Sequence, residues 1–272
     1  MTYKKLINKI FKKTTGYVFV NSKVYSSLKS ESIKQKVLGI ANNFSTDYSF
    51  QNLIISYINN SQSKEQQDLF VLSFLNKKNG VFVEFGGLDG IQRSNTYMLE
   101  KFFNWNGLII EPSGQYRDSL KKNRSCKIDF RCVSEKTGGN VLFNEVKNSG
   151  LSTIHDYSFN DEHSSKRKKG LLYEVETVSL QDVILENGLP NTIDYISIDT
   201  EGSEYDIIKS FDFKKFYVKI ITIEHNNDKI KRNNIFDYLT KYGYERVLVN
   251  FSGNDDWYIS KQILNKIPRF RF

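Results

Sequence analysis

Short apolar runs alternate with amphipathic segments along the chain from residue 61 onward. Runs rich in Val, Ile and Phe, bounded by glycine, proline or acidic residues, are typical of strands that are buried on both faces. Five runs predict core strands: residues 81–85, 107–110, 127–133, 192–198 and 218–223. Helical spacing is found at residues 66–75, 94–103 and 116–122, and from about Ser203. Because strands and helices alternate, we expect a mainly parallel, doubly wound sheet.

The two ends of the chain depart from this pattern. Residues 244–250 and 256–259 predict an antiparallel hairpin that ends the sheet, whereas residues 1–60 combine helical periodicity with polar Ser and Asn stretches. We therefore expect an α/β fold, with a Rossmann-like domain at residues 61–272 and a helical N-terminal extension at 1–60. Within the extension, residues 3–11 predict a packed amphipathic helix, a pattern that is also compatible with peripheral contact with a membrane.

Charge changes this picture little. The 272 residues include 39 Lys and Arg against 31 Asp and Glu, a net charge of +8 that favours anionic partners only in general terms. The densest basic run, residues 166–169, has no interleaved aromatic residues, so it predicts a solvated loop rather than a nucleic-acid surface. We therefore do not expect nucleic acid as a partner.

The cysteines and the hydropathy pattern bear on the compartment. Cys126 and Cys132 fall close together in a predicted strand region, where they would not face each other well enough to form a disulfide. Sparse cysteines fit a reducing environment, and we find neither an apolar stretch of about 18 residues nor a secretory cleavage site. We expect a soluble, cytoplasmic protein, for which a homo-oligomer is as compatible as a monomer.

The ends of the first two predicted strands have the composition of a ligand site. In Glu84-Phe85-Gly86-Gly87-Leu88-Asp89-Gly90, the glycines permit close approach of a ligand to the backbone. The full G-x-G-x-x-G signature is absent, so an adenosyl group is better supported than a nicotinamide dinucleotide. Glu111, followed by Pro112, stands where a carboxylate can accept hydrogen bonds from both hydroxyls of a ribose. The alternative is an exposed strand-end glutamate before a turn.

Acidic residues also follow the fourth predicted strand. Asp199, Glu201 and Glu204 lie within six residues of one another, and their charges repel unless a cation, a proton or a helix N-terminus relieves them. We take Asp199 as the stronger candidate for a working site. Glu204 could instead serve only to cap the helix that follows.

Glu224 and His225 follow the fifth predicted strand. His225 could deprotonate a substrate hydroxyl near neutral pH, or it could make a structural hydrogen bond. Glu224 could pair with Asp199 to hold a divalent ion, which would act as a Lewis acid. The remaining histidines, His155 and His163, flank a polar loop and are expected in solvent.

Several segments also carry a resemblance to a known family through their order and spacing. They are Ser61-Gln62 with Gln67-Asp68, residues 83–90 with Ser94-Asn95-Thr96 and Leu99-Glu100, Trp105-Asn106-Gly107 with Ile110-Glu111-Pro112, residues 198–204, and Glu224-His225-Asn226. Together these segments resemble the FkbM-type methyltransferases, Rossmann-like S-adenosylmethionine enzymes that act mostly on sugar or polyketide hydroxyls. The resemblance extends over about residues 61–260.

What this resemblance implies is a site for S-adenosylmethionine. The residues that it assigns to the cofactor are Glu84, Gly86, Gly87, Asp89, Gly90, Ser94, Asn95, Glu111, Pro112 and Asp199. Gly87 departs from many relatives, which carry alanine or another small residue there. A weaker likeness to metal-assisted sugar methyltransferases adds Asp199 and Glu224 as ligands of a divalent cation such as Mg²⁺.

The reaction expected from the resemblance is O-methylation of a saccharide or a nucleotide-linked sugar, in the biosynthesis of a glycan or polysaccharide. His225 is the first candidate for the general base and Asp199 the second. Residues 151–170 are expected to form a lid over the acceptor. Rival interpretations are an RNA or protein methyltransferase, a non-catalytic Rossmann-like interaction module and a nicotinamide oxidoreductase.

Overall fold

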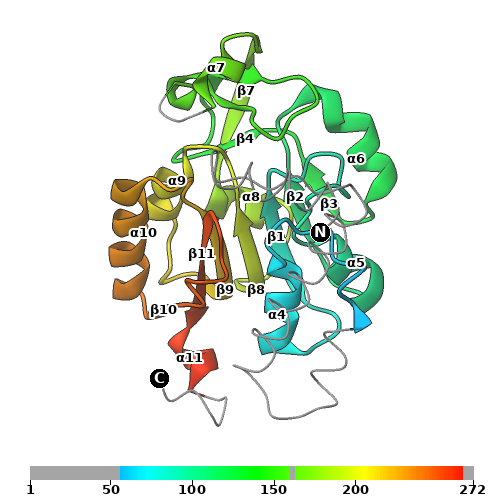
Figure 1. Cartoon of the computed structure of the whole chain (residues 1–272), viewed down its shortest axis with the longest axis vertical. Coiled ribbons are helices and arrows are strands. Elements are labelled where there is room, and N and C mark those ends of the chain that lie inside the picture. Colours follow the sequence, from blue (N-terminus) through cyan, green and yellow to red (C-terminus); the bar gives the residue numbers. More distant parts are fainter. Residues whose placement is uncertain (1–55, 160–162, 266–272) are drawn as a thin grey trace, which may run out of the picture.

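The computed structural model describes residues 56–159 and 163–265 (Figure 1). The predicted helical extension, with its amphipathic segment at residues 3–11, lies outside the described residues apart from positions 56–60. In the described part of the chain, none of the helices combines the length and the apolar character that crossing a membrane requires.

A seven-stranded sheet forms the centre of the molecule, in the order β10-β11-β9-β8-β1-β2-β3. Its strands are β1 (Val81–Phe85), β2 (Asn106–Ile110), β3 (Lys127–Asp129), β8 (Thr192–Ile198), β9 (Tyr217–Glu224), β10 (Tyr244–Val247) and β11 (Asp255–Ser260). The first five pair in parallel, and β11 runs antiparallel between β9 and β10. The strand order reverses at β1, which is where open sheets of this kind bind ligands.

Helices cover both faces of this sheet, as predicted. They are α4 (Gln67–Leu75), α5 (Tyr97–Phe103), α6 (Arg117–Asn123), α8 (Leu180–Glu186), α9 (Glu204–Ser210), α10 (Lys229–Lys241) and α11 (Lys261–Leu264). Alternate side chains of β1 enter different cores, since Val83 and Phe85 pack with α8, α9 and α10, while Phe82 packs with α4, α5, α6 and α11. The doubly wound α/β fold with a C-terminal antiparallel hairpin is therefore confirmed.

A second, four-stranded sheet stands beyond the carboxyl ends of the parallel strands (Figure 1). Its order is β4-β7-β5-β6, and it consists of β4 (Cys132–Ser134), β5 (Asn140–Glu145), β6 (Thr153–Ile154) and β7 (Leu171–Ser179). We call this sheet, together with the short helices η2 (His155–Tyr157) and α7 (Ser164–Arg167), the cap. The segment predicted to cover the acceptor, residues 151–170, supplies β6, η2 and α7.

The prediction of one strand at residues 127–133 was wrong. The chain turns after β3, where Asp129 Oδ1 accepts a hydrogen bond from the backbone N of Arg131 at 2.9 Å. The Arg131 guanidinium folds back onto the same carboxylate at 2.7 Å. The following residues then join β7 of the cap instead of continuing in the central sheet. Cys126 and Cys132 are both free, as expected.

Candidate active site

A pocket lies between the carboxyl ends of β1, β2, β8 and β9 and the cap. It contains about 980 Å³ of empty space, with its open mouth included. We call it the main pocket. The residues predicted for the site that line it are Gly86, Asn95, Glu111, Pro112, Asp199 and Glu224.

The glycine turn after β1 brings the backbone against the end of β8. Gly86 has a φ of +74°, and a Cβ there would lie 2.4 Å from the carbonyl oxygen of Asp199. A Cβ on Gly87 would lie 2.4 Å from Cγ2 of Ile109, on β2. Neither position has room for a side chain, so the two glycines let three strand ends meet around the pocket.

Glu84 is buried at the end of β1 and contacts the segment that precedes α5. Its carboxylate accepts hydrogen bonds from Ser94 Oγ at 2.9 Å, from the backbone N of Asn95 at 2.5 Å, and from Thr96 Oγ1. Arg124 lies 3.5 Å from the same carboxylate. Glu84 and Ser94 therefore fix this segment in place and are not part of the pocket wall.

Asn95 is the residue that this network presents to the main pocket. Its Nδ2 donates to Ser197 Oγ at 2.9 Å, while its Oδ1, although buried, has no hydrogen-bond partner in the described structure. A buried acceptor without a partner costs free energy, on the order of 1–3 kcal/mol, unless a bound group satisfies it. Asn95 Oδ1 is thus suited to accept a hydrogen bond from a ligand.

Asp89 and Gly90 shape the loop rather than line the pocket. Asp89 Oδ1 accepts hydrogen bonds from the backbone N of Ile91 at 2.9 Å and of Gln92 at 2.8 Å, which closes a turn. Gly90 has a φ of +84° and packs against the side chains of helix α6. Their position supports the loop that carries Leu88 to the pocket wall.

Glu111 is buried at the end of β2 and faces the main pocket. Its two carboxylate oxygens each accept one backbone hydrogen bond, from Leu88 N and from Ser113 N, both at 2.9 Å. Burial raises the pKa of Glu111 to about 7, against the effect of these two hydrogen bonds. Since each oxygen has a second lone pair, the carboxylate can accept two further hydrogen bonds from a ligand.

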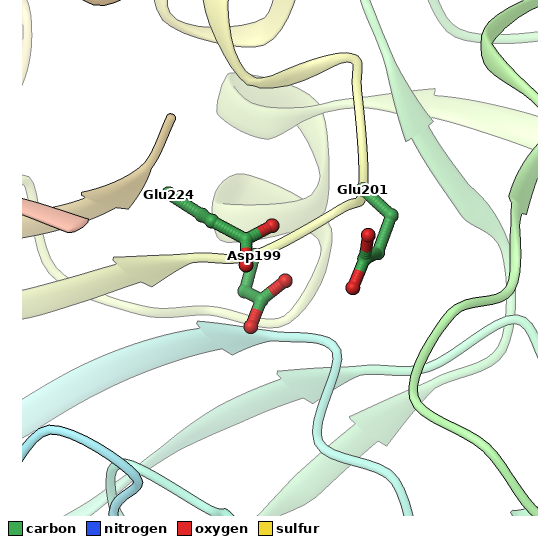
Figure 2. Close-up of side chains that lie close together, drawn as sticks. All are labelled: Asp199, Glu201 and Glu224. Carbon is green, nitrogen blue, oxygen red and sulfur yellow. The ribbon is translucent and has the colours of Figure 1, made fainter. Parts of the chain in front are cut away.

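Three carboxylates converge where β8 and β9 end (Figure 2). Asp199, Glu201 and Glu224 each offer an oxygen within 4.8 Å of the others. Glu201 was not among the predicted site residues, although it lies in the acidic segment that the sequence singles out. It has a φ of +60°, which turns it toward the other two residues after β8.

Protons and one arginine relieve the repulsion in this cluster. Arg167 of the cap, itself buried, lies 2.8 Å from Glu201 Oε2 and neutralises that carboxylate. Burial and then the charge of Asp199 raise the pKa of Glu224 well above its ordinary value. Burial and the charge of Glu204 raise the pKa of Asp199 to about 6. Burial and the mutual repulsion of the two groups thus favour a proton on Glu224 beside an ionised Asp199.

Glu204 holds the loop that carries Asp199. Its Oε1 accepts hydrogen bonds from the backbone N of Thr200 at 3.1 Å and of Gly202 at 2.9 Å, and its Oε2 lies 2.9 Å from Lys231 Nζ. Glu204 is fully buried and does not line the main pocket. It is a structural residue, but its hydrogen bonds hold the loop before α9 and do not cap that helix.

His225 points away from the main pocket. Its buried ring accepts a hydrogen bond at Nδ1 from the backbone N of Asn227 at 3.0 Å, and its Nε2 lies 3.9 Å from Asp256 Oδ1. Burial lowers its pKa. The structure therefore does not bring His225 together with Asp199 and Glu224 at the pocket.

Besides Glu201, a second acidic residue of the main pocket was missed by the sequence analysis. Asp255, at the start of β11, accepts a hydrogen bond from Gln67 Nε2 at 2.6 Å, and burial raises its pKa to about 7. The sequence analysis considered residues that follow parallel strands. Asp255 instead precedes the rest of β11, which is antiparallel and begins at this edge of the sheet. The Asp255-Asp256 pair before an apolar strand was the available signal.

Comparisons with known proteins bear on the family. The model of the methyltransferase FkbM domain matches residues 84–246, more than half of the chain. No curated protein matches this chain. The match covers both pairs of strand ends that form the main pocket.

Several solved structures, two methyltransferases among them, share a distant likeness with this chain. The methyltransferase FkbM from Methylobacillus flagellatus KT is 11% identical with a TM-score of 0.43, over 86% of this chain and 60% of that one. A precorrin-6y C5,15-methyltransferase from Geobacter metallireducens GS-15 is 14% identical with a TM-score of 0.36, over 80% and 93%. A mutant of MtNAS in complex with S-adenosylmethionine is 10% identical with a TM-score of 0.35, over 88% and 75%.

The present chain thus spans 60% of the length of the FkbM structure. The assignment to a family rests on the sequence match, which includes the glycine turn after β1, the end of β2 with Glu111, and the acidic loop after β8. These are the segments on which the resemblance was first noted, and they form one pocket at the switch point of the sheet. The chain belongs to the FkbM family of methyltransferases.

Proposed function

We propose that this protein transfers a methyl group from S-adenosylmethionine to a hydroxyl of a saccharide, either free or linked to a nucleotide. The observation that supports it most is the pair of carboxylates Asp199 and Glu224, whose oxygens lie within 4.8 Å of each other beside the glycine turn in the main pocket. A carboxylate with a pKa near 6 is deprotonated at neutral pH and basic enough to assist the loss of a hydroxyl proton.

The residues of the main pocket fit the cofactor. The Glu111 carboxylate can accept two further hydrogen bonds, from ribose hydroxyls. Asn95 Oδ1, which lacks a partner, can accept one from an amine or a hydroxyl of the ligand. The acidic lining also suits the positive charge of a sulfonium group. Gly86 lines the pocket and has no side chain to obstruct a ligand there. Five cofactor predictions, at Gly86, Asn95, Glu111, Pro112 and Asp199, are therefore consistent with direct contact.

S-adenosylmethionine supplies a methyl group that is already activated by the positive charge on sulfur. The pocket has to align the acceptor oxygen with that methyl group and exclude water, which accounts for a large part of catalysis in such transfers. Before transfer, Glu224 in its protonated form stabilises the ionised Asp199 by donating a hydrogen bond to it. Asp199 then accepts the proton that the acceptor hydroxyl loses as its oxygen takes the methyl group from sulfur. We favour Asp199 over His225 as the base because the ring of His225 does not reach the pocket.

A divalent cation at Asp199 and Glu224 stays a prediction. Glu201 would be the third carboxylate ligand, but Arg167 already pairs with it at 2.8 Å. We therefore favour a proton on Glu224 over a bound metal ion. Methyl transfer should be unaffected by a chelator. A loss of activity with the chelator that Mg²⁺ restores would instead assign the three carboxylates to a metal site.

The experiment that tests this function is an assay for S-adenosylhomocysteine with purified protein, S-adenosylmethionine and a panel of saccharides and nucleotide sugars. We expect release with at least one acceptor, and an added methyl group on the product by mass spectrometry. Glu174→Gln, on the exposed face of the cap, serves as a control that keeps activity. Release only with RNA or protein acceptors would contradict the saccharide assignment.

A further inference from the structure

A second pocket lies beside the main pocket, and Glu201 lines both. Its walls come from the loop after β8, from α9, from the loop after β9 and from the first turns of α10, with Tyr157 of the cap on one side. It contains about 1250 Å³ of empty space, with its open mouth included. The two pockets thus adjoin at the same edge of the sheet, where Figure 2 shows Glu201 next to Asp199.

The lining of this second pocket is rich in neutral polar groups. Asn226, Asn227 and Asn234 provide amides that both donate and accept hydrogen bonds, and Tyr157 and Tyr205 add aromatic rings. Sugar hydroxyls likewise both donate and accept, and the C–H face of a sugar ring packs against aromatic side chains. The composition therefore matches a saccharide better than an apolar ligand.

The walls are also held in fixed positions. Tyr157 Oη donates to Asp206 Oδ2 at 2.5 Å, and its ring fits against Gly202, where a Cβ would lie 2.6 Å from Cβ of Tyr157. Asn226 Nδ2 donates to Glu224 Oε2 at 2.8 Å. Through this hydrogen bond, a wall of the second pocket touches a carboxylate of the reacting pair in the main pocket.

The charges of the second pocket disfavour a phosphate ligand. Three acidic residues line it, Glu201, Asp206 and Asp228. The cation in its lining, Lys231, is paired with Glu204 at 2.9 Å. Among the described residues, the wall therefore offers a diphosphate mostly repulsion.

We propose that the second pocket is a saccharide subsite, which binds a neutral sugar unit of the acceptor next to the unit that is methylated in the main pocket. This inference rests on the proposed function and narrows it. The acceptor is then at least a disaccharide, and it enters between the cap and α10, with Glu201 between its two bound units.

Two neighbouring asparagines of α10 allow a matched test. Asn234 lines the second pocket, whereas Asn233 is exposed on the same helix and does not line it. The probes are lactose, chitobiose and UDP-glucose, with binding measured by saturation-transfer NMR in the presence of S-adenosylmethionine. We expect a disaccharide to bind the parent protein and Asn233→Ala alike. Asn234→Ala should bind it about fivefold to tenfold more weakly, the loss expected for one hydrogen bond.

The outcomes separate this inference from the function on which it rests. Binding of S-adenosylmethionine without binding of either disaccharide, equal disaccharide binding by both variants, or binding of UDP-glucose alone would each overturn the subsite. Failure to bind S-adenosylmethionine would contradict the proposed function itself. Asn234→Trp, which fills the pocket from an exposed helical position, should abolish disaccharide binding while leaving cofactor affinity unchanged.

Discussion

At the scale of single residues, the buried carboxylates of the site fall into two groups. One group holds neighbouring loops in place, and the other faces the main pocket. Glu84 and Glu204 are buried in hydrogen bonds that fix neighbouring loops. Glu111, Asp199 and Glu224 face the main pocket, and burial raises the pKa of each. Raised pKa values in a pocket are typical of functional groups. Burial there removes water from the carboxylates, and the protein leaves room for a ligand to supply the missing partners.

Glu111 provides a prediction about cofactor affinity. If ribose hydroxyls donate to its carboxylate, Glu111→Ala should weaken binding of S-adenosylmethionine by about 1–3 kcal/mol. The ionised form is the one that binds, and its pKa is about 7. Affinity should therefore fall as pH drops below 7, and this dependence should vanish in Glu111→Gln. Calorimetry from pH 5.5 to pH 8.5, roughly one unit and a half either side of that pKa, measures both effects. Unchanged affinity in Glu111→Ala would overturn the ribose assignment.

Substitutions of Asp199 and of His225 should differ in their effect on kcat. Asp199→Asn should lower kcat by about 10²–10⁴-fold, the usual contribution of a general base, while His225→Gln should retain most of it. With a base whose pKa is about 6, the rate of the parent enzyme should fall as pH drops through 6 and level off above it. A larger loss for His225→Gln than for Asp199→Asn would restore the histidine as the base.

At the scale of elements, the core strands were predictable because each is an apolar run closed by a turn residue. Helical spacing identified α4, α5, α6 and α9, but not α8 or α10. The sheet of the cap was not predictable in this way. Its strand β7 alternates apolar and charged side chains, with Glu174 and Glu176 among the charged ones, and is exposed on one face. Such strands lack the continuous apolar run that identifies the core strands. The break between β3 and β4 depends on a side-chain turn at Asp129, which apolar periodicity does not report.

The candidate site, like the fold, was predictable in part from the sequence. Acidic residues at the ends of parallel strands identified Glu111, Asp199 and Glu224, because these ends meet at one edge of the sheet. The direction in which a side chain points after its strand ends could not be inferred, and this is why His225 was favoured although its ring packs toward Asp256. Asp255 lies on a strand of opposite direction, to which the rule does not apply.

The glycine turn between β1 and α5 gives a prediction at this scale. Gly86→Ala introduces both a left-handed backbone strain and a Cβ 2.4 Å from a carbonyl oxygen of β8. Gly138 has a similar φ of +83° with nothing within 4 Å, so Gly138→Ala introduces the strain alone. Thermal unfolding should show a cost of about 1–3 kcal/mol for the control and a larger one for Gly86→Ala. Equal costs would mean that the turn does not need close contact with β8.

At the scale of the whole molecule, the net charge of +8 contrasts with the acidic lining of both pockets. The overall charge therefore describes the outer surface and says little about the substrate. Carboxylates in the main pocket suit a cationic cofactor, and the second pocket suits a neutral sugar. The cap contributes Phe143 and Ile154 to the main pocket and Tyr157 to the second, so under the proposed function it borders the space of the acceptor.

The measurement that tests the account most directly is isothermal titration of the purified protein with S-adenosylmethionine and, separately, with NAD. Glu111→Ala is titrated in parallel. We predict micromolar binding of S-adenosylmethionine to the parent protein, weaker binding to the variant, and no heat with NAD. Binding of NAD alone, or of neither compound, would contradict the assignment of the main pocket as a site for the methyl donor.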